Sequence, residues 1–365
     1  MDKYKKKYIF IICSTILFNL NLFSNYISVD EYISSYPEEK ILMNKFVSVV
    51  NNKAVPLSIK NKKVKIAMLY PSLQLSDYWR RNKIAFEKRL VKLNINYDLD
   101  LLKTTNISCS KKQSKFIEQI IKEKYDFFIT TLNSDLEKNL IRKVLVLTKT
   151  KVILQNITTP IIEWKKTQPL IYIGFDHKIG SLKLANYYKN KFKDGKYAVM
   201  FHTDGYVSQM RGDTFISYMN NNSDLKLVDS YYTNGDKNRA YEATLDLLKK
   251  HKDLRFIYAC ATDIAIGVSN AVESLGLQDK ILVNGWGGGS AELKMLSNSK
   301  LDVTVMRMND DAGIVMAEVI KSIILKEKTP KIFSGQIELI DKKTLKVDIE
   351  LLKKKSFRYS NENNK

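Results

Sequence analysis

The sequence predicts an α/β protein made of two doubly wound lobes, each built on a parallel sheet. From Lys62 onward, short runs rich in β-branched and aromatic residues alternate with amphipathic runs of helical length. The strand candidates are almost continuously apolar, which is typical of parallel strands covered by helices on both faces. At 365 residues, the chain is long enough to form two lobes, each with its own core.

Strand candidates and helical runs can be placed in order along the chain. The strand candidates are residues 64–70, 97–102, 125–132, 151–157, 170–176, 196–202, 225–232, 255–263, 280–286 and 301–308. Helical runs, with apolar residues at three-to-four spacing, cover residues 79–93, 115–124, 181–192, 239–251 and 265–276. Residues 158–169 contain two prolines and interrupt the alternation, so we place a lobe boundary there. The lysine-rich tail beyond Asp341 is expected to be only partly ordered.

Residues 1–24 have the pattern of a secretory signal peptide. Four lysines within the first seven residues precede an apolar run, residues 9–23, and Ser24 lies in a zone suited to cleavage. An uncleaved membrane anchor is the alternative, but the run is short and contains Ser14, Asn19 and Asn21. We therefore expect export to the periplasm with cleavage near Ser24.

The composition limits the partners and the covalent cross-links that can be expected. The formal charge of +21 invites a nucleic-acid interpretation, but the lysines are spread through every helical run and no basic block interleaves with aromatic residues. We expect no nucleic-acid partner. After cleavage only Cys109 and Cys260 remain, and because their predicted positions lie in different lobes we expect no disulfide between them.

Polar and aromatic residues recur where the predicted strands end. In open α/β sheets, ligands bind beyond the carboxyl ends of the strands, where side chains and helix N-termini converge. The residues at these positions are Gln74, Ser76, Trp79, Asn156, Arg211, Thr262, Asp263, Trp286 and Arg307. Together they predict a cleft with two aromatic faces, two guanidinium groups and several hydroxyl, amide or carboxylate groups. Such a cleft suits a small polyhydroxylated ligand, and the two arginines indicate that this ligand is anionic.

Each of these residues also has an ordinary structural interpretation. Ser76, Asp77 or Asp263 could cap a helix N-terminus, Trp79 could fill the core, and Arg211 could be a solvated helix charge. Arg80 and Arg81 are expected to be exposed residues of the first turn of a helix. Only the recurrence of such residues at the same sheet edge in both halves favours a binding cleft.

The sequence gives little support for catalysis. The three histidines, His177, His202 and His251, are scattered and none has metal-ligand spacing. The segment GWGGGSAE lacks the ending of a phosphate loop and the pattern of a nucleophile elbow. A glycosidase would need two positioned carboxylates, and only Asp263 is a good cleft candidate. We expect no enzyme, no metal and no cofactor.

Seven long motifs carry a resemblance to a known family. They are YPSLQLSDYWRRN, ILQNITTP, YIGFDH, GYVSQMRGDTFI, FIYACATDIAIG, VNGWGGGSAEL and LDVTVMRMNDD. These motifs resemble the LuxP-type receptors for the quorum-sensing signal autoinducer 2, which belong to the type I periplasmic binding proteins. The resemblance runs from about Lys62 to about Tyr359. The segment before Lys62, the lysine-rich tail and the loop from His202 to Asp204 depart from the family pattern.

The resemblance implies a two-lobed receptor with three hinge crossings. It places residues 62–161 and 309–336 in the N-terminal lobe and residues 162–308 and 337–360 in the C-terminal lobe. It also implies that the nine cleft residues bind autoinducer 2 as its furanosyl borate diester, with borate as part of the ligand rather than as a cofactor. The implied partner is a membrane sensor kinase resembling LuxQ.

Two other functions remain open from the sequence. The chain could be a sugar-binding protein that delivers a pentose-like ligand to an ABC transporter or a chemoreceptor. It could also be an exported carbohydrate-processing enzyme, although the missing carboxylate pair counts against that function.

Overall fold

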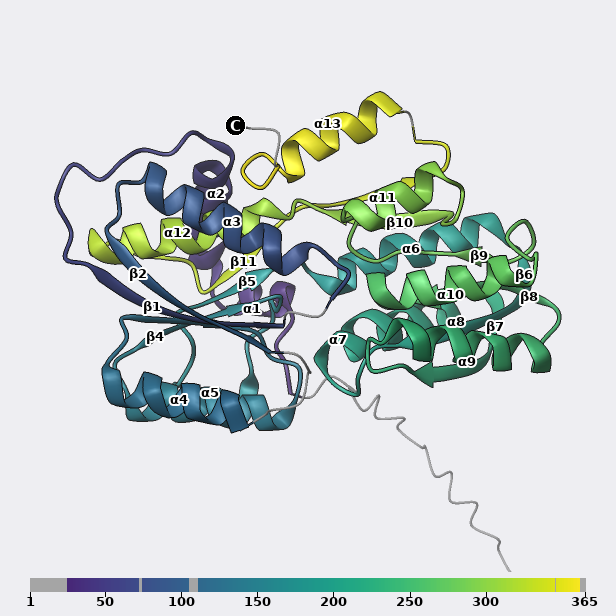
Figure 1. Cartoon of the computed structure of the whole chain (residues 1–365), viewed down its shortest axis with the longest axis horizontal. Coiled ribbons are helices and arrows are strands. Elements are labelled where there is room, and N and C mark those ends of the chain that lie inside the picture. Colours follow the sequence, from purple (N-terminus) through teal and green to yellow (C-terminus); the bar gives the residue numbers. More distant parts are fainter. Residues whose placement is uncertain (1–24, 72–73, 105–110, 345, 362–365) are drawn as a thin grey trace, which may run out of the picture.

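The computed structural model describes residues 25–71, 74–104, 111–344 and 346–361, and it contains two α/β lobes side by side (Figure 1). The predicted signal peptide and Cys109 lie outside the described residues. Among the described residues, the helices α1 (Val29–Ser35) and α2 (Pro37–Asn51) precede the first strand. Helix α1 begins with a capping box: the Ser28 side chain accepts from the Glu31 backbone N, and the Glu31 side chain accepts from the Ser28 backbone N.

The N-terminal lobe is built on a six-stranded parallel sheet of order β11-β5-β4-β3-β1-β2. Its strands are β1 (Val64–Pro71), β2 (Tyr97–Thr104), β3 (Phe127–Thr130), β4 (Lys151–Gln155), β5 (Ile171–Gly174) and β11 (Ile332–Ser334). Its helices are α3 (Tyr78–Lys92), α4 (Lys111–Glu123), α5 (Asp135–Leu147) and α12 (Asp310–Ile324), with a short 3₁₀ turn, η1 (Ile162–Trp164). Figure 1 shows α3 and α12 on one face of the sheet and α4 and α5 on the other.

The C-terminal lobe is built on a second, mostly parallel sheet of order β7-β6-β8-β9, extended by the antiparallel pair β10-β12. Its strands are β6 (Asp194–Phe201), β7 (Asp224–Tyr232), β8 (Leu254–Ala259), β9 (Leu282–Val283), β10 (Val303–Arg307) and β12 (Ile337–Asp341). Isolated bridges join Asn284 to Val303 and Gly287 to Met306, so β10 continues the sheet beyond β9. Its helical segments are α6 (His177–Lys191), α7 (Tyr206–Ser208), the π-helical η2 (Gln209–Asp213), α8 (Thr214–Asn222), α9 (Lys237–Lys250), α10 (Thr262–Ser274), α11 (Ser290–Ser297) and α13 (Lys346–Ser356).

The alternation of side chains along β6 explains why this lobe has helices on both faces. Tyr197 and Val199 belong to the core that includes Tyr188 of α6, whereas Ala198 and Met200 belong to the core that includes Leu247 of α9. Successive residues of a strand point to opposite faces, so a continuously apolar strand must be covered twice. The predicted doubly wound α/β fold is therefore confirmed.

The chain crosses between the lobes at three places. The first crossing follows β5, the second lies between β10 and α12, and the third joins β11 to β12. Backbone hydrogen bonds tie the crossings together: Gly335 N donates to Gly174 O at 2.8 Å, and Met308 N donates to Gln336 O at 3.2 Å. The boundary predicted after residue 161 is wrong, because β5 follows the proline-containing segment and still pairs with β4 in the first sheet.

The described part of the lysine-rich tail contains a regular helix, where the sequence predicted only partial order. Residues 346–356 form α13, and Phe357 beyond it is buried. The Arg81 guanidinium of α3 lies 3.8 Å from the centre of the Phe357 ring, and Arg89 of the same helix donates to the Tyr359 hydroxyl at 2.6 Å. Phe357 belongs to the core of the C-terminal lobe, to which the resemblance assigned residues up to 360, whereas Tyr359 and Ser360 donate from their backbone N to Asp310 of the N-terminal lobe. The last described residues therefore contact both lobes.

Candidate functional site

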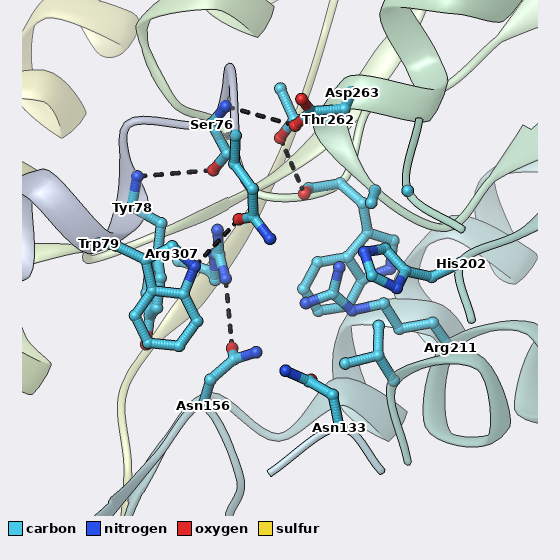
Figure 2. A pocket seen from close by; sticks show the side chains of 15 residues that line it. Ser76, Tyr78, Trp79, Asn133, Asn156, His202, Arg211, Thr262, Asp263 and Arg307 are labelled. Carbon is cyan, nitrogen blue, oxygen red and sulfur yellow. Dashed lines mark hydrogen bonds between the residues drawn. The ribbon is translucent and has the colours of Figure 1, made fainter. Parts of the chain in front are cut away.

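One pocket between the two lobes brings all nine predicted cleft residues together. It is lined by Gln74, Ser76, Tyr78, Trp79, Asn133, Asn156, His202, Val207, Arg211, Gly235, Ala261, Thr262, Asp263, Trp286 and Arg307. Figure 2 shows these side chains converging from both lobes. The cavity volume is about 50 Å³. A ligand the size of a monosaccharide therefore needs the lobes or the lining side chains to move before it can be seated.

The N-terminal wall is formed by the turn after β1 and the start of α3. Trp79 is mostly buried, and its ring lies 4.9 Å from the ring of Tyr70 in the core of the lobe. Its indole Nε1 donates to Gln74 Oε1 at 2.9 Å, so the two side chains form one rigid wall. Trp79 thus fills the core, as in the ordinary interpretation, and also lines the pocket.

Asn156 enters the pocket from the end of β4 in a left-handed backbone conformation, with a φ of 64°. Its backbone N donates to Ile173 O at 2.7 Å, and its carbonyl lies 3.0 Å from Nε2 of His177. Asparagine is one of the few residues that tolerates this conformation. The turn therefore directs the Asn156 amide toward the C-terminal lobe, where its Oδ1 lies 3.5 Å from Nη1 of Arg307.

Arg211 lies in η2 and is only 4% exposed, so it is not the solvated helix charge of the ordinary interpretation. Its Nε donates to His177 Nδ1 at 2.9 Å and its Nη1 donates to Cys260 O at 2.8 Å. The guanidinium lies over the Trp286 ring, 3.7 Å from its centre. Burial and the neighbouring Arg211 charge hold the pKa of His177 well below its usual range. A neutral His177 that accepts at Nδ1 carries its proton on Nε2, which faces the carbonyl of Asn156.

Arg307, the last residue of β10, is also 4% exposed. Its guanidinium lies 4.1 Å from the centre of the Tyr78 ring and 5.9 Å from that of Trp286. Within the described residues, its Nε has no hydrogen-bond partner. Both arginines therefore flank the same Trp286 ring.

The two guanidiniums are poorly compensated. Among the described residues, no carboxylate lies within ion-pair distance of Arg211 or Arg307. Burial and the charge of Arg307 lower the pKa of Arg211 to about 9, and burial lowers the pKa of Arg307. Two buried like charges are costly unless an anion lies between them. The pocket therefore contains two buried positive charges without a carboxylate partner among the described residues.

A buried carboxylate holds the loop that carries Trp286. Glu292 of α11 accepts hydrogen bonds from Trp286 N at 3.0 Å and from Gly288 N at 2.8 Å, and it also accepts from the Thr304 hydroxyl. These contacts satisfy a fully buried carboxylate and fix the backbone on both sides of the indole. The backbone that carries Trp286 is thus fixed beside the two arginines.

Asp263 connects the two lobes. Its carboxylate accepts from the backbone N of Leu75 at 2.8 Å and of Ser76 at 3.4 Å, both in the turn after β1. It is not the N-cap of its own helix, because that position is held by Ala261. Burial raises the pKa of Asp263, while the two backbone donors lower it. Beside it, the Thr262 hydroxyl donates to Trp286 O at 3.4 Å.

This two-lobed fold with a pocket between the lobes has known relatives. The sequence profile of the periplasmic binding protein domain matches residues 66–328, which is well over half of the chain. The chain belongs to the periplasmic binding protein domain family.

The relatives of this family member are solute-binding proteins. The D-allose-binding periplasmic protein of Escherichia coli K12 is 28% identical over 123 residues, which is 33% of this chain and 39% of that protein. The match thus spans about two fifths of that relative's length. An ABC transporter solute-binding protein from Agrobacterium vitis with bound D-fucose has a TM-score of 0.71 and 19% identity, covering 78% of this chain and 98% of that one.

A second similar structure is the fructose-binding periplasmic domain of a hybrid two-component system. Its TM-score is 0.67 and its identity is 17%, covering 79% of this chain and 93% of that domain. At this identity the likeness shows the fold alone.

Arg81 is the one named cleft-flanking residue whose predicted exposure is wrong. It is buried and forms an ion pair with Asp77 at the start of α3. Its Nη2 donates to the Ser290 hydroxyl at 2.8 Å, and its Nη1 donates to the Ser360 hydroxyl at 2.9 Å. Because those partners lie in segments distant in sequence, no local sequence pattern predicts them. Arg80 is exposed, as predicted.

Six pocket-lining residues were not predicted: Tyr78, Asn133, His202, Val207, Gly235 and Ala261. Two of them carried the same signal as the nine. His202 directly follows β6, and Asn133 follows β3, so both lie beyond the carboxyl end of a strand. The rule that located the cleft could have located these two residues as well.

The described residues contain no group of three or more His, Cys, Asp or Glu side chains placed to hold a metal ion. In the same part of the chain, no helix has the length and apolarity needed to cross a bilayer. Cys260 is buried as a free thiol, and burial raises its pKa.

Proposed function

We propose that this protein is a periplasmic receptor for autoinducer 2 in its furanosyl borate diester form, and that it relays the signal to a membrane sensor kinase resembling LuxQ. The observation that carries the proposal is the pair of buried guanidiniums of Arg211 and Arg307, which flank Trp286 without an ion-pair partner among the described residues. The proposed ligand contains a tetrahedral borate with one negative charge.

The binding free energy that the two arginines contribute should be larger for an anionic ligand than for a neutral sugar. A charge-assisted hydrogen bond contributes about 1.5–3 kcal/mol, roughly twice as much as a neutral one. An anion between the two guanidiniums also removes their mutual repulsion, which is reflected in the lowered pKa of Arg211. A neutral sugar would leave that repulsion in place.

The remaining pocket groups suit the sugar-like part of such a ligand. Asn156, Thr262 and Asp263 can exchange hydrogen bonds with ring hydroxyls, and the faces of Trp79 and Trp286 can cover its apolar side. None of these groups is placed as an acid–base pair, and we propose a binding protein rather than an enzyme.

The alternative function is delivery of a pentose-like sugar to an ABC transporter or a chemoreceptor. It is supported by the names of relatives, which include a D-allose-binding protein and a transporter component with bound D-fucose. Association with a sensor kinase is supported by the fructose-binding domain of a two-component system. The two functions differ in whether the preferred ligand is anionic.

Calorimetric titration with and without borate separates the two functions. Wild-type protein should bind autoinducer 2 more weakly when borate is removed from the buffer, and D-ribose should bind more weakly than the borated signal. Arg211→Met and Arg307→Met should each lower affinity for the borated ligand a few-hundred-fold or more, because one buried charge of the complex loses its partner. Trp79→Phe, which keeps a ring face, should cost much less.

Melting curves without ligand provide the folding control. Arg307→Met should melt no lower than wild type, because it removes a buried charge with an unpaired Nε. If wild-type binding is indifferent to borate, or D-ribose binds as tightly, the receptor proposal fails and the sugar-transport function replaces it.

A further inference from the structure

His202 is a buried pocket residue outside the nine that the sequence singled out. It follows β6 directly, and its backbone is held on both sides: its N donates to the Ser208 hydroxyl at 3.1 Å, and its O accepts from Asn234 N at 2.9 Å. Figure 2 shows its ring beside Arg211, pointing toward the space that the other side chains surround.

The two ring nitrogens of His202 have different surroundings. Nδ1 lies 3.1 Å from the Thr203 hydroxyl, so one nitrogen is satisfied by the neighbouring residue. Within the described part of the chain, Nε2 has no hydrogen-bond partner, although the residue is only 8% exposed. A buried side chain with one nitrogen satisfied and the other open to a pocket is arranged for a contact with a ligand.

The backbone at Gly235 makes room for this ring. Gly235 has a φ of +67°, and a Cβ added there would lie 2.4 Å from His202 Nε2. A side chain at this position would therefore cover the nitrogen that faces the pocket. Glycine keeps it accessible.

We propose that His202 is a ligand-contacting residue that determines specificity, presenting Nε2 to a hydroxyl group of the bound ligand. A hydroxyl fits because it can donate or accept, and the Thr203 hydroxyl can likewise satisfy either tautomer at Nδ1. Burial and the charge of Arg211 lower the pKa of His202 to about 4, so the ring is neutral near pH 7. The anionic part of the ligand is thereby left to the two arginines.

This inference rests on the proposed function only in taking the pocket as the binding site for a small hydroxylated ligand. A purely structural role would instead require the ring only for its packing and for its contact with Thr203. The two roles can be separated because Nε2 and Nδ1 face different partners.

The experiment compares the affinities of four variants with that of wild type, using borated autoinducer 2 or D-ribose, whichever wild type binds more tightly. His202→Phe keeps a ring and removes both nitrogens, and His202→Gln restores a donor close to the position of Nε2. Thr203→Val removes only the partner of Nδ1, and His251→Gln is the matched control at a histidine outside the pocket. Melting temperatures of all variants are measured in parallel.

We expect His202→Phe to bind about five- to tenfold more weakly, which corresponds to one lost neutral hydrogen bond. His202→Gln and Thr203→Val should stay within about threefold of wild type, and His251→Gln should be unchanged. In long-range ¹H–¹⁵N spectra of wild type, ligand should shift the Nε2 resonance of His202 and leave that of His251 in place.

Wild-type affinity in His202→Phe, or a loss in Thr203→Val as large as in His202→Phe, would overturn the inference. Neither result would bear on the borate dependence of wild type, which tests the receptor function separately.

Discussion

Two buried histidines make the free energy of unfolding depend on pH in the acid range. His177 and His202 both have a pKa lowered by burial and by Arg211, to about 4 in the case of His202. In the unfolded chain each would titrate near its ordinary value of about 6.5. Below that pH the unfolded state binds protons that the folded state does not, so the free energy of unfolding falls as pH falls from about 6.5 toward 4.

His202→Gln should weaken this acid sensitivity. Each buried neutral histidine contributes a loss of up to about 1.4 kcal/mol per pH unit, so the drop in the free energy of unfolding between pH 7 and pH 5 should shrink by about 2 kcal/mol. Burial raises the pKa of Glu137 to about 6, which acts in the opposite direction, but it is common to both proteins and cancels. Urea unfolding at the two pH values measures the difference. Equal drops in wild type and variant would show that His202 is not held neutral.

At the scale of elements, the strands of the two sheets were predicted well, and the misses have physical causes. Helix α12 is absent from the predicted set, and its burial on nearly all sides, which includes Asp310, Asp311 and Glu318, depends on contacts with distant segments. Strands β11 and β12 are short and separated by a hinge crossing, and their partners β5 and β10 are remote in sequence. Such pairing depends on tertiary contacts rather than on local pattern.

The candidate site was predictable for a different reason. Its residues lie at the carboxyl ends of strands, a position that sequence pattern locates once the strands are known. The burial of the Arg81 side chain was not predictable, because Ser290 and Ser360 are distant in sequence and form hydrogen bonds with it only in the folded chain. The predicted strand at residues 280–286 is also shorter than expected, since only Leu282–Val283 form a regular strand, followed by an isolated bridge at Asn284.

The glycine loop after β9 has a packing requirement that can be tested at Gly288. Its φ is +64°, and an added Cβ would lie 2.4 Å from Met306 Cα in the neighbouring strand. Gly288→Ala should therefore displace the loop that carries Trp286, lowering the free energy of unfolding by about 1–3 kcal/mol and ligand affinity at least tenfold. Chemical denaturation and calorimetry measure the two effects.

Gly276→Ala is the matched control for that variant. Gly276 has nearly the same φ, +65°, but nothing lies within 4 Å of an added Cβ. Gly276→Ala should introduce the backbone strain without displacing the loop that carries Trp286, and its ligand affinity should equal that of wild type. If both variants bind normally, the loop does not position Trp286.

At the scale of the whole molecule, hydrogen bonds outside the pocket hold the lobes together. Asp77 of the N-terminal lobe accepts from Ser290 of α11, at 2.8 Å from the hydroxyl and 3.3 Å from the backbone N. Arg81 donates to the same hydroxyl and to Ser360 in the tail. The described structure is therefore a closed form, in which a polar latch of Asp77, Arg81, Ser290 and Ser360 supplements the contacts of Asp263 with the turn after β1.

The latch predicts that a residue outside the pocket controls affinity. Ligand binding requires the closed form. A change that destabilises closure therefore lowers the apparent affinity by the same factor by which it lowers the closed fraction of the ligand-free protein. Ser290→Ala removes two hydrogen bonds of the latch and should weaken binding about five- to tenfold. Small-angle scattering should show a more extended ligand-free protein and an unchanged ligand-saturated one. Ser297→Ala, on the same helix but bonded only within its own chain segment, should behave as wild type. Unchanged affinity together with unchanged ligand-free dimensions in Ser290→Ala would mean that the pocket contacts alone close the lobes.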